Sequence, residues 1–132
     1  MSPFVLSHIA FAFLGIITLI PAVILQFILK KNPNSYKIHK TLSLIGLVLI
    51  ATGIASIVTF FTMVKAPHLN SLHGKIGAVG FLFLLDTAII GHFFMKHSNL
   101  RKIHKLLGII AMTLVLIAAL LGTIQVIQFL RR

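Results

Sequence analysis

Four long apolar runs take up most of this 132-residue chain and constrain its fold more than any other feature. Each run is near or above the ~20 residues that a helix needs to cross ~30 Å of hydrocarbon. A hydrophobic share of 58% and a mean hydropathy of +1.09 also fit a chain that lies mostly in lipid. The runs are Phe4–Leu29, Thr41–Val64, Ile76–Met95 and Leu106–Leu130. We therefore predict an all-α integral membrane protein, a bundle of four transmembrane helices.

The basic residues gather at the ends of these runs and predict the topology. A net charge of +11 on a soluble domain would suggest nucleic acid, but here the basic residues flank spans, so we expect lipid as a partner and no nucleic acid. Loops 30–40 and 96–105 hold eight of the twelve basic residues, which predicts that they are cytoplasmic and that both termini are outside. We expect a prokaryotic cell membrane as the location.

The chain is an internal repeat. Shifting the sequence by 65 residues aligns its halves without a gap, so that His8 matches His73 and the run "KIHK" at 37–40 matches "KIHK" at 102–105. We predict a single membrane domain over residues 1–132, with repeats 1–65 and 66–132. Each repeat is a helical hairpin with an even number of spans, so the two copies share one orientation and a pseudo-two-fold axis along the membrane normal.

A histidine lies at or near the start of every span: His8, His39, His73 and His104. Because alternate helices run in opposite directions, His8 and His73 lie near the outer face and His39 and His104 near the inner face. Two imidazoles that face each other across a helix bundle are the axial ligands of a six-coordinate b-type haem. The repeat therefore predicts two bis-histidine sites for haem b, with these four histidines as the metal ligands. The absence of cysteine excludes covalent attachment of haem through C-x-x-C-H.

Small residues follow each histidine at offsets of four, seven and fourteen, which keeps them on its side of the helix. They are Ala12, Ser43, Gly77 and Gly108, then Gly15, Gly46, Gly80 and Ala111, then Ala22, Gly53, Thr87 and Ala118. We interpret the first two sets as flanking the haem of the same helix and the third as making room beside the haem of the opposite leaflet. Close helix packing through small residues, which needs no cofactor, explains the same faces and stays open as an alternative.

The remaining polar residues give further candidates. Lys37, Lys40, Arg101, Lys102 and Lys105 inside, with Lys75 outside, can bind haem propionates or an anionic electron donor, and contact with lipid phosphates explains them equally well.

One acidic residue and three further histidines are the other polar candidates. Asp86, the only acidic residue, lies in the middle of a span and is a candidate proton carrier, with a protonated, hydrogen-bonded carboxyl as the alternative. His68, His92 and His97 lack counterparts in the other repeat, and we expect surface or interfacial roles for them, with His92 as the rival candidate for the inner pair of ligands.

The histidine pattern, with glycine-bearing segments such as "HKTLSLIG" at 39–46, "HGKIGAVG" at 73–80 and "HKLLGIIA" at 104–111, resembles the four-helix core of the cytochrome b561 family. The resemblance spans essentially the whole chain and implies transmembrane electron transfer through two b haems, and a transmembrane oxidoreductase of the quinone or ascorbate type. Members of that family usually add helices around this core, and we expect no such helices from this sequence. Their substrate-binding segments have no match, so no ascorbate or quinone site is carried over.

A second class of protein also fits the pattern. Small four-helix membrane proteins that assist the assembly of copper-containing oxidases use histidines for transient metal binding or partner contact. The small-residue faces discriminate between the classes, because a macrocycle needs them and a copper relay does not. Donor and acceptor stay open between quinol, ascorbate and protein, and the assembly stays open between a homodimer and a subunit of a larger redox complex.

Overall fold

The computed structural model describes residues 1–28, 34–65, 68–93 and 97–131, and nearly all of them are helical. The four long helices are α1 (Pro3–Ile28), α2 (Ser35–Met63), α3 (Leu72–Phe93) and α4 (Ser98–Leu130), and a short 3-10 helix, η1 (His68–Asn70), precedes α3. Even α3, the shortest with 22 residues, is about 33 Å long and so matches the thickness of the hydrocarbon core. The predicted all-α fold with four membrane-spanning helices is confirmed, and the protein is an integral membrane protein.

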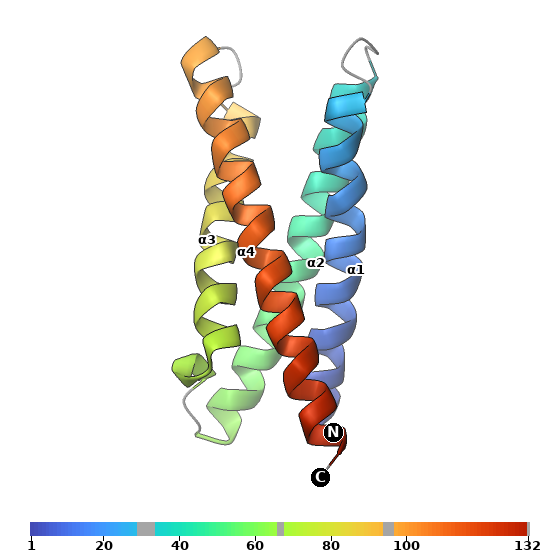
Figure 1. The fold of residues 1–132 in the computed structure, drawn as a ribbon, viewed down its shortest axis with the longest axis vertical. Coiled ribbons are helices and arrows are strands. Elements are labelled where there is room, and N and C mark those ends of the chain that lie inside the picture. The colour runs from blue at the N-terminus through green and yellow to red at the C-terminus, as the bar shows by residue number, and fades with distance from the viewer. Residues whose placement is uncertain (29–33, 66–67, 94–96, 132) are drawn as a thin grey trace. The chain divides into compact units, whose positions relative to one another are not determined.

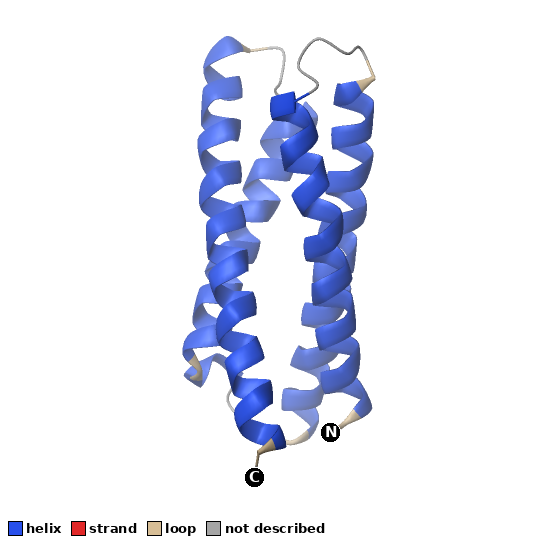
Figure 2. Cartoon of the chain, turned by 45° about the vertical axis from the view of Figure 1, so that its right-hand side comes forward, coloured by secondary structure: helices blue, strands red, loops and turns tan. Residues whose placement is uncertain are grey.

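The helices pack as two antiparallel hairpins, α1 with α2 and α3 with α4 (Figures 1 and 2). The contacts divide the chain into two compact units, Met1–Ala66 and Pro67–Arg132, which follow the repeat. Each hairpin is thus a compact unit of its own.

The two basic segments are more helical than expected. We placed residues 30–40 and 96–105 in loops, but α2 begins at Ser35 and α4 at Ser98, so that Lys37, Lys40, Lys102 and Lys105 lie in the first turns of helices. Lysine and arginine are good helix formers, and hydropathy marks the part of a helix in lipid rather than its end. Residues 30–33 and 96 of these segments lie outside the described part of the chain.

Close helix crossings hold each hairpin together. A Cβ placed on Gly15 of α1 would lie 2.6 Å from Ile50 Cγ1 and 3.0 Å from the carbonyl oxygen of Gly46 in α2. A Cβ on Gly46 would lie 2.6 Å from Leu19 Cγ, and the buried Leu19 has little room to move. In the second hairpin a Cβ on Gly80 would lie 3.1 Å from Leu114 Cβ. Glycine is favoured at these crossings because atoms of the partner helix lie where a side chain would have to be.

Candidate functional site

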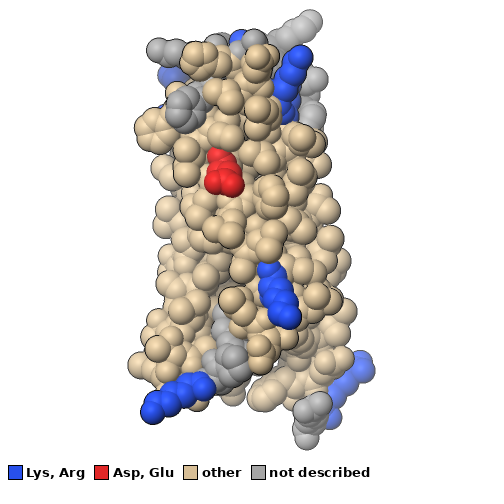
Figure 3. Space-filling model, turned by 90° about the vertical axis from the view of Figure 1, so that its left-hand side faces the viewer, with Lys and Arg blue, Asp and Glu red and all other residues tan. Residues whose placement is uncertain are grey.

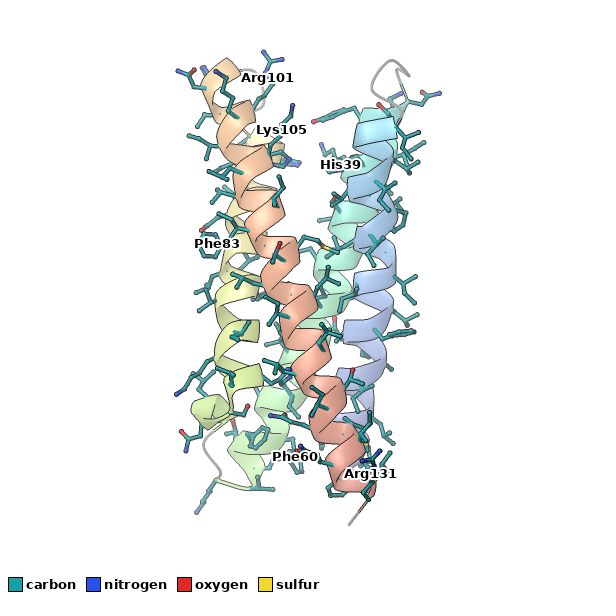
Figure 4. The ribbon with its side chains drawn as sticks, viewed as in Figure 1. His39, Phe60, Phe83, Arg101, Lys105 and Arg131 are labelled. Atoms are coloured by element: carbon teal, nitrogen blue, oxygen red, sulfur yellow. The ribbon has the colours of Figure 1, made fainter. Side chains whose placement is uncertain are left out.

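In the first hairpin, each of the two candidate ligand histidines is hydrogen-bonded to the backbone of the other helix. His8 Nδ1, from α1, lies 2.9 Å from the carbonyl oxygen of Gly53 in α2. His39 Nδ1, from α2, lies 2.8 Å from the carbonyl oxygen of Ala22 in α1. Both side chains are partly buried, and Figure 4 shows His39 near the start of α2. The hairpin thus carries one backbone-anchored imidazole towards each of its ends.

The second hairpin repeats this arrangement at the equivalent positions. His73 Nδ1 lies 2.8 Å from the carbonyl oxygen of Ala118, and His104 Nδ1 lies 2.9 Å from that of Thr87. Donors and acceptors both follow the 65-residue shift of the sequence. The repeat therefore duplicates a specific contact between side chain and backbone as well as a residue pattern.

The four carbonyl acceptors belong to the third set of small residues, which we expected to make room beside a haem of the opposite leaflet. Each lies fourteen residues after the histidine of its own helix and accepts a hydrogen bond from the histidine of the partner helix. The small side chains of Ala22, Gly53 and Ala118 leave the backbone oxygen open to an approaching ring, and all three residues are buried. In the structure, the backbone carbonyls of this set therefore bind the candidate ligand histidines, a role that the sequence interpretation did not include.

These contacts fix the chemistry of the imidazoles. A carbonyl oxygen only accepts hydrogen bonds, so Nδ1 must carry the proton and donate it. In a neutral imidazole the lone pair is then on Nε2, which is the atom that binds a metal. Histidines that ligate metals almost always donate their other ring N–H to a carboxylate, a backbone carbonyl or water, which fixes the tautomer and raises ligand basicity. All four histidines thus have the tautomer and the backbone hydrogen bond that suit a haem-ligating imidazole.

The two histidines of one hairpin lie too far apart to share an iron. The oxygen that His8 contacts belongs to Gly53, fourteen residues along α2 from His39, which is about 21 Å at 1.5 Å per residue. The same spacing separates His104 from Ala118, the partner of His73. Each hairpin therefore offers one ligand at each of two levels.

The candidate cofactor-flanking glycines fall into two groups. Gly15, Gly46 and Gly80 lie at the close helix crossings described above, where packing alone favours glycine. Gly77 and Gly108 have more space: a Cβ on Gly77 would lie 3.7 Å from Ala118 Cβ, and one on Gly108 would lie 3.5 Å from Thr87 Cγ2. These two glycines therefore neighbour the residues whose carbonyls hold His73 and His104. Their role beside a haem stays a prediction.

Two glycines that the sequence interpretation omitted lie against the histidines of the second hairpin. A Cβ on Gly91 would lie 2.6 Å from His104 Cε1, and a Cβ on Gly122 would lie 2.9 Å from His73 Cε1. Both follow the histidine of their own helix by eighteen residues, which is five full helical turns. Extending the small-residue pattern by one turn beyond the fourteenth position would have found them.

The candidate basic residues all have exposed side chains. Lys37, Lys40, Lys102 and Lys105 lie near the starts of α2 and α4, close in sequence to His39 and His104, and Lys75 lies two residues after His73. Figure 4 labels Lys105 and Arg101 in the first turns of α4. Contacts of these residues with haem propionates or with lipid phosphates stay a prediction.

The other candidates are separate from the histidine contacts. Asp86 is exposed on α3, and Figure 3 shows the single acidic side chain surrounded by uncharged surface. His92 is exposed in the last turn of α3, with its ring centroid 4.7 Å from that of Phe93. His97 is exposed at the start of α4, and His68 begins η1. The expected surface positions of His92 and His97 agree with this exposure.

Comparison with known proteins matches the chain to a family model. A family model described as eukaryotic cytochrome b561 matches residues 5–130, a range that includes all four backbone-anchored histidines. No curated protein and no solved structure matches the chain.

Proposed function

The chain belongs to the eukaryotic cytochrome b561 family, a family of haem-based transmembrane electron carriers, and from this premise we propose that it binds two b-type haems through four histidines. In this proposal His8 and His73 ligate one iron, and His39 and His104 ligate the other. The observation that carries it is the fourfold hydrogen bond from imidazole Nδ1 to a backbone carbonyl.

The pairing follows from the spacing within each hairpin. Two ligands about 21 Å apart cannot bind one iron, so each iron takes one histidine from each hairpin. Successive spans cross the membrane in opposite directions, so the starts of α1 and α3 share one face and the starts of α2 and α4 share the other. This leaves His8 with His73 and His39 with His104, one pair per face.

The residues of the chain supply orientation, basicity and exclusion of water. When bound, haem would supply one-electron chemistry, and ligation by the imidazoles of these histidines would favour electron transfer over oxygen binding. The carbonyls of Ala22, Gly53, Thr87 and Ala118 hold the rings against rotation and keep the proton on Nδ1. The apolar helices exclude water around the sites.

The basic residues define where electrons enter or leave in this proposal. Lys37, Lys40, Lys102 and Lys105 lie near the cytoplasmic pair, because the segments that carry them are the more basic ones and the positive-inside rule places these on the cytoplasmic side. Exposed lysines beside a ligand histidine suit propionates or an anionic donor such as ascorbate, and a quinol or a protein is the alternative donor.

The test is a reduced-minus-oxidised absorption spectrum of the purified protein, combined with a pyridine haemochrome assay for haem per chain. We expect two low-spin b haems per chain. His8→Ala and His73→Ala should each remove or convert one haem, and His39→Ala and His104→Ala the other. His92→Ala is the matched control, because His92 is a helical histidine outside the set and should leave both haems in place.

Two results would contradict the proposal. Loss of both haems from every single variant would indicate one shared site. A colourless but stable protein that binds copper would instead support a role in the assembly of copper-containing oxidases.

A further inference from the structure

The environment of the histidines differs between the two hairpins at a single helical position. In an α-helix the carbonyl of a residue lies beside the residue four positions later, whose N–H it accepts. An imidazole that donates to this carbonyl therefore packs against that later residue. For the carbonyls of Thr87 and Ala118 the later residues are Gly91 and Gly122.

Equivalent positions in the first hairpin carry side chains. The residue four positions after Gly53 is Ile57, and the residue four positions after Ala22 is Gln26. The hydrogen bonds are nevertheless of the same length, 2.8–2.9 Å, in both hairpins. A ring placed against Ile57 as His73 is placed against Gly122 would lie too close to Cβ. A ring seated as His73 is seated is therefore excluded beside Ile57 by its Cβ.

We propose that Gly91 and Gly122 are positioning residues that set the placement of the His104 and His73 imidazoles. This inference rests on the function proposed above, because the placement of these rings matters to function only if they are ligands. It adds a difference between His73, which packs against a glycine, and His8, for which the equivalent position in α2 is Ile57.

A side chain at position 91 would clash with the imidazole of His104. A Cβ on Gly91 would lie 2.6 Å from Cε1, 3.0 Å from Nδ1 and 3.5 Å from Nε2 of His104. Carbon atoms in ordinary contact are about 3.5–4.0 Å apart, so a methyl group would push the ring away by about 1 Å. Gly91 and Thr87 lie one turn apart on the same side of α3, so the push also moves Nδ1 away from the Thr87 oxygen. A bond that starts at 2.9 Å would then be longer than a hydrogen bond allows.

The helices themselves should tolerate this change. The clashing atoms belong to the end of a side chain rather than to backbone, and alanine favours a helix more than glycine does. Gly91→Ala and Gly122→Ala are thus expected to displace one ring each and to leave the hairpin folded.

The experiment is two-dimensional NMR of the ¹⁵N-histidine-labelled full-length protein, as purified and kept reduced, with redox titration of the same samples. Gly91→Ala should remove or shift the Nδ1–H resonance of His104 alone, and Gly122→Ala that of His73 alone. Each variant should also change the midpoint potential of one haem only.

The matched control is Thr123→Ala. Thr123 directly follows Gly122, but its side chain is exposed and its hydroxyl donates a hydrogen bond to the carbonyl oxygen of Ala119 within α4. The resonances of His73 and His104 should not move in this variant.

Every outcome separates the two proposals. If the purified protein holds no haem, the proposed function fails, and the NMR result still decides whether the glycines position the rings. If both haems are present but the resonances of His104 and His73 are unchanged in Gly91→Ala and Gly122→Ala, the inference about the glycines fails alone. Loss of helical structure in these two variants would also overturn it, because the clash would then involve more than a ring.

Discussion

Both hairpins have the same arrangement of histidines and carbonyl acceptors, but their glycines lie at different positions. In the first hairpin, Gly15 and Gly46 both lie at the α1–α2 crossing, where a Cβ on either would come within 2.6 Å of a side chain of the other helix. In the second, the position equivalent to Gly46 is Ala111, which is fully buried as alanine. There the closest approach to a glycine comes from a histidine ring instead.

The comparison distinguishes features that both repeats keep from features that differ between them. The imidazole and its backbone acceptor occur four times, with small residues or threonine at the acceptor. By contrast, the helix crossing is tighter in the first hairpin than in the second, and only the second hairpin has glycine at the position that packs against the histidine ring. A change at the crossing should therefore affect stability mainly in the first hairpin, and a change behind the ring should affect ligand placement mainly in the second.

The largest effect on stability is expected for Gly46→Ala. The new methyl group would lie 2.6 and 2.8 Å from two carbons of the buried Leu19 and 3.1 Å from the carbonyl oxygen of Gly15. Overpacking of this kind lowers the free energy of unfolding by about 2 kcal/mol. The free energy is measured by SDS titration in mixed detergent micelles. An unchanged value would show that the α1–α2 crossing opens without difficulty.

Gly80→Ala tests the equivalent crossing in the second hairpin and should have a smaller effect. Its Cβ would lie 3.1 Å from Leu114 Cβ and 3.3 Å from the backbone nitrogen of Val115, so shifts of a few tenths of an ångström relieve the contact. We expect a loss of about 1 kcal/mol in the same titration. A loss as large as that of Gly46→Ala would mean that the crossings are equally tight, which would remove one of the two differences between the hairpins.

Most of the fold could be predicted from the sequence, because span length, hydropathy and the internal repeat are clear signals in it. Length and hydropathy gave four spans, and the 65-residue shift gave two hairpins. The error lay at the helix ends: polar residues such as Lys37 and Lys102 continue a helix although they interrupt an apolar run.

The hydrogen bonds of the site were beyond sequence reasoning. The acceptors are backbone atoms 17 or 45 residues away from the histidines, and every residue has a carbonyl. Which carbonyl faces the ring depends on how the two helices of a hairpin are aligned, and side-chain pattern does not specify that alignment. The small residues at the fourteenth position marked the right places, but a cofactor and a ring approaching the backbone both require small residues.

Ser56→Ala removes a contact for which the second hairpin has no equivalent. Ser56 Oγ in α2 donates a hydrogen bond of 3.1 Å to the carbonyl oxygen of Phe4 in α1, and the matching residue in α4 is Leu121. Hydrogen bonds between helices in membranes contribute about 0.6 kcal/mol on average, which is the loss expected. Thr59→Ala is the control, because Thr59 bonds only to the carbonyl of Ala55 within its own helix among the contacts described, and it should change stability less. Equal losses would show that the bond between helices adds nothing.

The smallest effect is expected for Gly108→Ala, which sharpens the comparison from the opposite side. Its Cβ would meet Thr87 Cγ2 at 3.5 Å, an ordinary contact, so no overpacking opposes the greater helix propensity of alanine. The free energy of unfolding should stay within about 0.5 kcal/mol of the wild type. A loss similar to that of Gly80→Ala would mean that α3 and α4 approach closely along their whole contact. The space beside Thr87 would then be no larger than that at a glycine crossing.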